Sequence, residues 1–189
     1  RISYLTRRSL KITMLYGFFF SGLMILLAEP LCRKLYGNAE AARYLKLYAL
    51  LIPMLYCDAI TDAMTKGLGQ QKACVRYNIL TSAMDVAFLY ILLPKYGMDG
   101  YFASFLVTHL LNFLLSLRRL LKISGLHLPF HIPVMILSGA LVSLGLASTL
   151  SGNFSRCVAY LLLLISSLTL CGILRREDVA WVRRLVVLR

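Results

Sequence analysis

The sequence predicts an all-α, polytopic membrane bundle of six transmembrane helices. Hydrophobic residues make up 59% of the 189 residues, and the mean hydropathy is +0.74. A soluble domain has roughly 45 to 50% apolar residues. Six apolar runs have the length of about 17 to 25 residues that a helix needs to cross a bilayer. The net charge of +13 arises between those runs, so it indicates membrane orientation and not nucleic-acid binding.

Six segments are predicted to span the membrane, and prolines punctuate them. Pro30, with Glu29, is expected to close the first segment, and residues 31–38 then form an interfacial turn. Pro53 is expected to kink the second segment, and Pro94 to stop the third. The predicted spans are residues 9–28, 42–65, 76–93, 101–117, 132–150 and 157–174.

These spans define the predicted organisation of the chain. Residues 1–122 form four spans, residues 123–131 a cytosolic connector, and residues 132–174 two additional spans. Residues 175–189 are expected to form an amphipathic helix in the cytosolic interface, the alternative being an ordinary terminus without a regulatory role. In the fifth span, small residues recur every four positions, which lets two helices approach closely in lipid. They are Gly139, Ser143 and Ala147.

The distribution of basic residues predicts the orientation. With both termini in the cytosol, 15 of the 21 Lys and Arg residues lie on the inner side and 6 on the outer side. The opposite orientation would violate the positive-inside rule at nearly every loop. The six predicted outer residues are Arg33, Lys34, Arg43, Lys46, Lys95 and Arg156.

Two carboxylates lie within the second span, where an ionised side chain costs several kcal/mol. Asp58, Asp62 and Lys66 are four residues apart and share one helical face. One hypothesis is a polar stripe that lines a transport cavity or binds a proton or cation. The alternative is an intrahelical ion-pair ladder in which Lys66 extends to the cytosolic interface. Asp58 lies about 12 Å deeper than Lys66 and is the harder of the two acids to explain structurally.

The third span adds further candidates. Asp85 is predicted near the middle of the membrane, either in a transport or coupling role or as a hydrogen-bonded acid that holds adjacent helices together. Among basic residues, Lys66, Arg76 and Lys11 are close enough to helix interiors to contribute to a binding site. Each is equally well explained as an interface anchor.

No metal site, cofactor site, disulfide framework or enzyme active site is predicted. The five cysteines show no CxxC pattern, and several lie in apolar runs. His127 and His131 are four apart, but Pro129 between them argues against a helical metal site. His109, alone in an apolar span, is interpreted as a packed neutral histidine. No nucleophile elbow, P-loop or HExxH motif is present.

Several short motifs, taken in order, resemble the C-terminal half of the multidrug/oligosaccharidyl-lipid/polysaccharide (MOP) exporter superfamily, in particular polysaccharide-export flippases of the stage V sporulation protein B type. The most specific piece is Leu93-Pro94-Lys95-Tyr96-Gly97-Met98-Asp99-Gly100-Tyr101. The other pieces are Leu35-Tyr36-Gly37, the helix of residues 44–63 with Pro53, Lys66-Gly67-Leu68-Gly69-Gln70, Asn78, and Asn112 before a basic loop.

The resemblance implies a fold and a function. Residues 1–122 would be the last four helices of a two-lobed MATE-like bundle, and residues 130–175 the two extra helices of fourteen-helix members. The family flips polyprenyl-pyrophosphate-linked saccharides, precursors of cell wall or polysaccharide, across the bacterial cytoplasmic membrane by alternating access. Because the chain begins with Arg1, we expect a fragment that lacks the N-terminal lobe, the partner it needs for transport. In the family, the cations that bind the pyrophosphate lie largely in the first lobe and in the start of the second, which this chain lacks, so no substrate-binding residue is carried over.

Three other functions remain open from the sequence. A cation-coupled multidrug exporter of the same fold would use Asp58 or Asp85 as its coupling acid. The chain could also be a non-transporting membrane scaffold of cell-wall synthesis. An intramembrane transferase is the least favoured, because most of the eight acids lie in loops or at helix ends.

Overall fold

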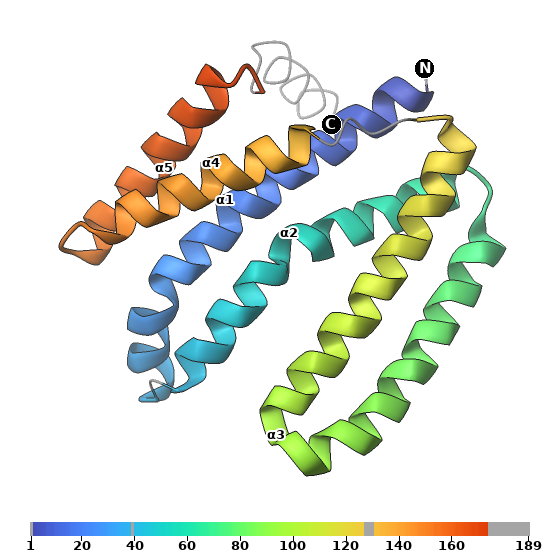
Figure 1. Ribbon diagram of the computed structural model, residues 1–189, viewed down its shortest axis with the longest axis horizontal. Coiled ribbons are helices and arrows are strands. Elements are labelled where there is room, and N and C mark those ends of the chain that lie inside the picture. Colours follow the sequence, from blue (N-terminus) through green and yellow to red (C-terminus); the bar gives the residue numbers. More distant parts are fainter. Residues whose placement is uncertain (1, 39, 127–130, 174–189) are drawn as a thin grey trace. The chain divides into compact units, whose positions relative to one another are not determined.

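The computed structural model describes residues 2–38, 40–126 and 131–173. Over these ranges the chain forms five α-helices and no β-strand (Figure 1). All five are long and apolar enough to cross a membrane, which agrees with the predicted all-α, multi-pass membrane protein. The predicted tail and His127 lie outside the described residues. The helices are α1 (Ile2–Tyr36), α2 (Glu40–Gly67), α3 (Gln71–Ser124), α4 (His131–Ser148) and α5 (Asn153–Leu170).

Helix α1 does not end at Pro30, as the sequence predicted, but continues to Tyr36. Two interactions keep the last turns helical. Arg33 forms an ion pair with Glu29 at 2.7 Å across the proline, and Ala28 and Cys32 are buried in a small apolar cluster. Proline removes a single backbone donor, and this packing offsets the loss.

Helix α3 consists of two helical arms that join at a non-helical residue, Gly97, where the chain reverses direction (Figure 1). Pro94 was predicted to stop the third span, but the helix passes it and the break lies at Gly97, with φ 57° and ψ −135°. This backbone conformation is open essentially to glycine alone. Gly100 is equally constrained, since a Cβ there would lie 2.4 Å from the carbonyl oxygen of Leu92. The reversal produces two arms, residues 71–96 and 98–124.

The chain forms two compact units. Unit 1 consists of Arg1–Thr13 and Met54–Leu128, and unit 2 of Met14–Pro53 and Pro129–Arg189. Unit 1 therefore holds the second half of α2 and both arms of α3. The turn between these helices contains the motif Lys66-Gly67-Leu68-Gly69-Gln70, with Gly69 at φ 77°. The amide of Gln70 donates to the carbonyl of Thr65 at 3.1 Å and so closes the turn.

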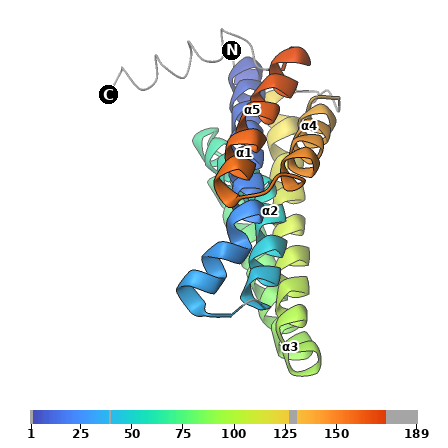
Figure 2. The ribbon, with the colours of Figure 1, turned by 90° about the vertical axis from the view of Figure 1, so that its left-hand side faces the viewer.

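Unit 2 has an apolar core built from α1, α4 and α5. Helices α4 and α5 lie side by side (Figures 1 and 2). The predicted small-residue stripe on α4 is confirmed: Ser143 and Ala147 are buried, and Gly139 faces Ser167 of α5. The fully buried core residues are Ile136, Ala147, Tyr160 and Leu164, and residues of α1 such as Phe18 and Leu23 pack against them.

Tyr160 joins α5 to α1. Its hydroxyl donates to the backbone carbonyl of Phe18 at 2.7 Å, and its ring covers Gly22 so closely that a Cβ there would lie 2.1 Å from the ring. The ring is fully buried, so it has no room to move aside.

Gly22→Ala should therefore destabilise unit 2 by about 1–3 kcal/mol, the usual cost of overpacking. Thermal unfolding in detergent, followed by circular dichroism, measures the effect. Gly145→Ala is the matched control, because a Cβ there meets nothing within 4 Å, and it should be neutral or stabilising by about 0.4–1 kcal/mol. Equal stability of the two variants would contradict the packing described for Tyr160.

Gly97→Ala should destabilise unit 1 by about 1–3 kcal/mol, because alanine at this φ and ψ is strained. The control is Gly67→Ala at the end of α2, where a Cβ meets nothing within 4 Å and φ is not positive. Unfolding in the same detergent should distinguish the two. A Gly97→Ala protein as stable as Gly67→Ala would show that the reversal does not require glycine.

Candidate functional site

A polar stripe runs along the second arm of α3. Ser104, Thr108, Asn112 and Ser116 are four residues apart, so they share one face of an otherwise apolar helix. Ser104, Thr108 and Ser116 are buried, and Asn112 is half-buried. Hydrocarbon offers no hydrogen-bond partner, so polar groups at this depth must find partners within the protein.

Two side chains of this stripe donate hydrogen bonds to Asp85 on the first arm. The hydroxyl of Ser104 donates to Asp85 Oδ1 at 2.6 Å, and that of Thr108 donates to the same oxygen at 3.2 Å. In a straight helix Asp85 and Ser104 would lie about 28 Å apart. The contacts therefore depend on the reversal at Gly97. Asp85 lies about 18 Å from Gly97 along its arm.

Asp58 is held by the same stripe. The side-chain amide of Asn112 donates to Asp58 Oδ2 at 3.2 Å and approaches Oδ1 at 3.4 Å. This contact joins α2 to the second arm of α3. Asp58 is half-buried. Its partner is thus a neutral amide of another helix and not a cation of its own helix.

A small pocket of about 150 Å³ opens beside Asp85. Its walls carry a carboxylate, hydroxyls, amides and an imidazole, and it is large enough for several water molecules. His109 also stacks against Phe105, with ring centroids 4.1 Å apart. The lining residues are Asn78, Thr81, Ser82, Asp85, Thr108, His109 and Asn112.

The arrangement can hold a proton or a hard cation. Carboxylate, amide and hydroxyl oxygens are the ligands that such cations prefer. The side chains that donate hydrogen bonds to Asp58 and Asp85 lie on one face of one helix. Asn112 lines the pocket and also donates to Asp58. Thr108 and Asn112, which donate to Asp85 and Asp58, lie one turn apart on α3. Among the described residues, no group of three or more His, Cys, Asp or Glu residues could hold a metal ion, so any cation here would rely on hydroxyl and amide oxygens.

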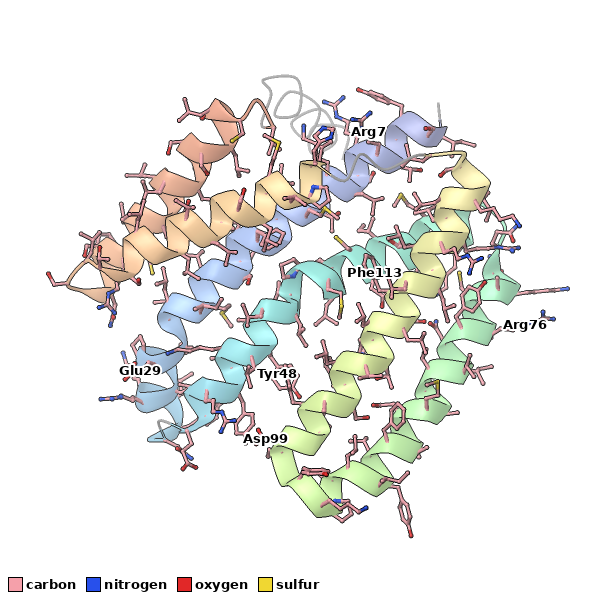
Figure 3. The ribbon with its side chains drawn as sticks, in the orientation of Figure 1. Arg7, Glu29, Tyr48, Arg76, Asp99 and Phe113 are labelled. Atoms are coloured by element: carbon pink, nitrogen blue, oxygen red, sulfur yellow. The ribbon has the colours of Figure 1, made fainter. Side chains whose placement is uncertain are left out.

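The other predicted site residues lie outside this cluster. Lys66 Nζ is 2.6 Å from Asp62 Oδ2, and the side chains are 43% and 20% exposed. This confirms the local ion pair of the ladder hypothesis, but the pair does not extend to Asp58. Arg76 is exposed and projects away from the first arm of α3 (Figure 3), so the structure does not bring it to the acids.

Sequence reasoning missed Ser104 and Thr108. The signal was present: from Ser104 to Ser116 polar residues recur every fourth position in a segment predicted to span the membrane. Such a stripe predicts a partner helix with complementary polar groups. A single Ser or Thr in a membrane helix is a weak signal, because its hydroxyl commonly bonds to its own backbone, as that of Thr108 also does to the carbonyl of Ser104 at 2.9 Å.

Comparison with protein-family models, with characterised proteins and with solved structures finds no match to this chain.

A double-mutant cycle on Asp85→Ala and Ser104→Ala should give a coupling free energy of about 0.6–1.7 kcal/mol, the range of interhelical hydrogen bonds in membranes. Unfolding in detergent measures it. Ser166→Ala is the matched control, because Ser166 is exposed and donates to its own helix at Leu163; paired with Asp85→Ala it should show no coupling. Strictly additive effects of Asp85→Ala and Ser104→Ala would refute the contact.

Proposed function

We propose that this chain is the C-terminal portion of a MOP-superfamily flippase that moves a polyprenyl-pyrophosphate-linked saccharide across a bacterial cytoplasmic membrane. In this proposal the two arms of α3 cross the membrane separately, which makes six crossings with both termini in the cytosol. The partner is an N-terminal lobe of the same polypeptide. The lobes alternate access to the lipid-linked saccharide from one side of the membrane to the other.

The observation that carries the proposal is the backbone conformation of the motif glycines. Gly37, Gly69 and Gly97 belong to three separate motifs of the resemblance, and all three have positive φ at helix ends. Each motif thus marks a reversal between apolar helices. The three glycines of the resemblance therefore stand where the backbone requires glycine, which supports the resemblance beyond the short sequence matches.

The basic residues that the sequence singled out near the acids, Lys66 and Arg76, do not form a cationic site for a pyrophosphate. Lys66 is paired with Asp62, and Arg76 is exposed on the outside of the helical hairpin. A pyrophosphate needs cations or helix N-termini in a wet cavity. In this proposal the cations that hold the pyrophosphate are therefore contributed mainly by the other lobe.

A second candidate is a cation-coupled exporter of the same fold. The cluster around Asp58 and Asp85 favours it, because two acids near the membrane centre have neutral hydrogen-bond donors and a polar pocket. Intramembrane acids of this kind mark ion and proton pathways. A non-transporting scaffold of cell-wall synthesis is the third possibility, and it would need neither acid.

The test begins with the gene. We expect about eight further transmembrane helices in frame upstream of Arg1, because the proposed fold has fourteen. An in-frame stop followed by a start codon immediately before Arg1 would overturn the flippase proposal and favour the scaffold. The full-length product, reconstituted in liposomes, should then expose a pyrophosphate-linked saccharide to an impermeant lectin on the opposite leaflet, and protein-free liposomes should not.

The same assay separates the two transport candidates. Asp58→Asn and Asp85→Asn should leave flipping unchanged if the acids are only structural, and should abolish its dependence on a proton or sodium gradient if they couple transport. Asp99→Asn is the matched control, because Asp99 is exposed near the reversal of α3. Gradient-independent transport in both site variants and the wild type would exclude the coupled exporter.

A further inference from the structure

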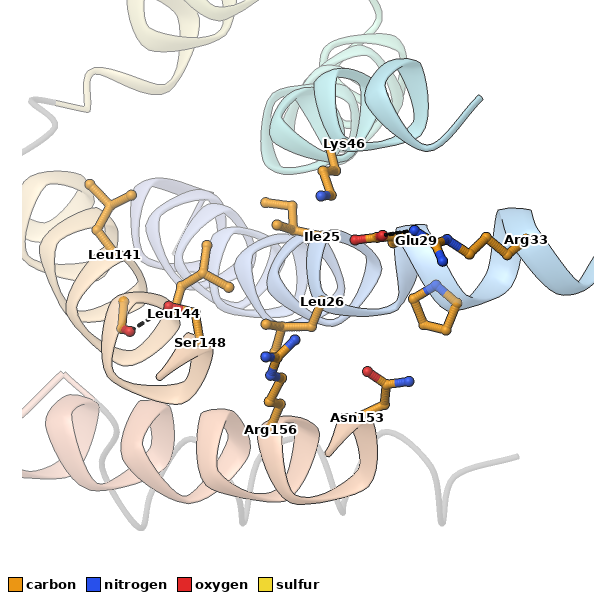
Figure 4. A pocket seen from close by; sticks show the side chains of 12 residues that line it. Ile25, Leu26, Glu29, Arg33, Lys46, Leu141, Leu144, Ser148, Asn153 and Arg156 are labelled. Carbon is orange, nitrogen blue, oxygen red and sulfur yellow. Dashed lines mark hydrogen bonds and ion pairs between the residues drawn. The ribbon is translucent and has the colours of Figure 1, made fainter. Parts of the chain in front are cut away.

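Unit 2 contains a larger pocket, formed by α1, α2, α4 and α5 (Figure 4). Its volume is about 710 Å³, within the range of about 300–1,000 Å³ typical of small-molecule sites. Part of its wall is apolar, with Ile25 and Leu26 from α1 and Leu141 and Leu144 from α4. A ligand in this pocket can therefore bury hydrocarbon.

The rest of the wall is strongly basic. Three of its side chains are cationic, namely Arg33, Lys46 and Arg156, and Glu29 is the one acid among them. Lys46 and Arg156 point toward α1 from opposite sides of the pocket (Figure 4). Glu29 is already paired with Arg33 at 2.7 Å. The charges of Lys46 and Arg156 are thus left without a carboxylate within ion-pair distance in the described chain.

Arg156 is oriented for an external anion. Its Nε donates to the backbone carbonyl of Leu150 at 2.7 Å, which fixes the plane of the guanidinium group. The terminal nitrogens are then directed into the pocket beside Asn153 (Figure 4). A planar guanidinium with free terminal donors binds phosphate through two parallel hydrogen bonds.

The distribution of basic residues along the chain also supports an anion site in this pocket. In the predicted orientation the outer side has six Lys and Arg residues, and five of them belong to unit 2, Lys95 being the exception. The positive-inside rule disfavours basic residues on that side. Three of the five line this single pocket, so they are gathered where a function would require them.

We propose that this pocket binds the phosphate head group of an anionic lipid from the outer leaflet. Lys46 and Arg156 hold the phosphate, and Leu141 and Leu144 contact the upper part of the acyl chains. The combination of a basic head-group site with an apolar wall is what distinguishes a lipid from a soluble anion. The site does not depend on the proposed transport activity, since it lies entirely in unit 2 and shares no residue with the Asp58 and Asp85 cluster.

The test is native mass spectrometry of the 189-residue chain in detergent, titrated with phosphatidylglycerol or with phosphatidylcholine. Both lipids have a phosphodiester and the same acyl chains, but only phosphatidylglycerol is anionic. The first phosphatidylglycerol should bind at least about fivefold more tightly than phosphatidylcholine. Lys46→Gln and Arg156→Gln should each weaken it by about fivefold, the usual contribution of one basic residue near an anionic lipid surface.

Lys34→Gln is the matched control. It removes the same charge as Lys46→Gln on the same predicted side, but Lys34 does not line the pocket, so the affinity should be unchanged. Lys46 makes no hydrogen bond or ion pair in the described chain, so its variant should unfold at the wild-type temperature and the loss of binding then reports the site itself.

Three results would overturn the proposal. Equal affinity for the two lipids would exclude an anionic head-group site. A loss in Lys34→Gln as large as that in Lys46→Gln would show that general surface charge attracts the lipid. Displacement of phosphatidylglycerol by millimolar inorganic phosphate would assign the pocket to a soluble anion and not to a lipid.

Discussion

The exclusion of water from the bilayer interior is the constraint on which this structure depends. A polar side chain in hydrocarbon needs a partner within the protein. Several side chains of α3 have one, whereas Ser116 Oγ and Asn112 Oδ1 are buried without a hydrogen-bond partner among the described residues. Ser104 and Thr108 donate to Asp85, and Asn112 donates to Asp58. One face of one helix thus holds two acids that would otherwise be costly at this depth.

These contacts exist only because the backbone reverses where it does. Gly97 adopts a backbone conformation that other residues avoid. Gly100 has no side chain, so the start of the second arm can lie against the carbonyl of Leu92 on the first arm. A glycine serves a similar purpose in unit 2, where Gly22 leaves room for the ring of Tyr160. In both units, small residues permit the close approach on which the polar contacts of larger side chains rely.

The acid cluster of unit 1 and the basic pocket of unit 2 leave charges of opposite sign without an ion-pair partner among the described residues. In unit 1, Asp58 and Asp85 are met by neutral donors, so each remains able to bind a proton or a cation. In unit 2, Lys46 and Arg156 face an open pocket whose single acid is already paired. Asp62 and Lys66 differ from these residues, because they form an ion pair with each other. The cluster around Asp58 and Asp85 is thus suited to a cation, and the proposed pocket of unit 2 to an anion.

The sequence by itself determined the features that depend on neighbouring residues. Apolar run lengths predicted a multi-pass all-helical chain, the glycine turn at Gly69 followed from residue type, and the Asp62 and Lys66 pair followed from spacing on one helix. Each of these is governed by contacts within a turn or two of helix. The prediction from local sequence was wrong at Pro30, where α1 continues and the neighbouring Ala28 and Cys32 are buried by packing.

Only the tertiary structure decided the partners of the intramembrane acids. The contact of Asp85 with Ser104 bridges 19 residues, and that of Asp58 with Asn112 bridges 54. The basic pocket likewise combines side chains from Ile25 to Arg156. The spacing of residues along a helix predicts which of them share a face, but it does not predict which other helix packs against that face. That choice is made by the reversal at Gly97 and by the packing of Tyr160, because these bring distant segments together.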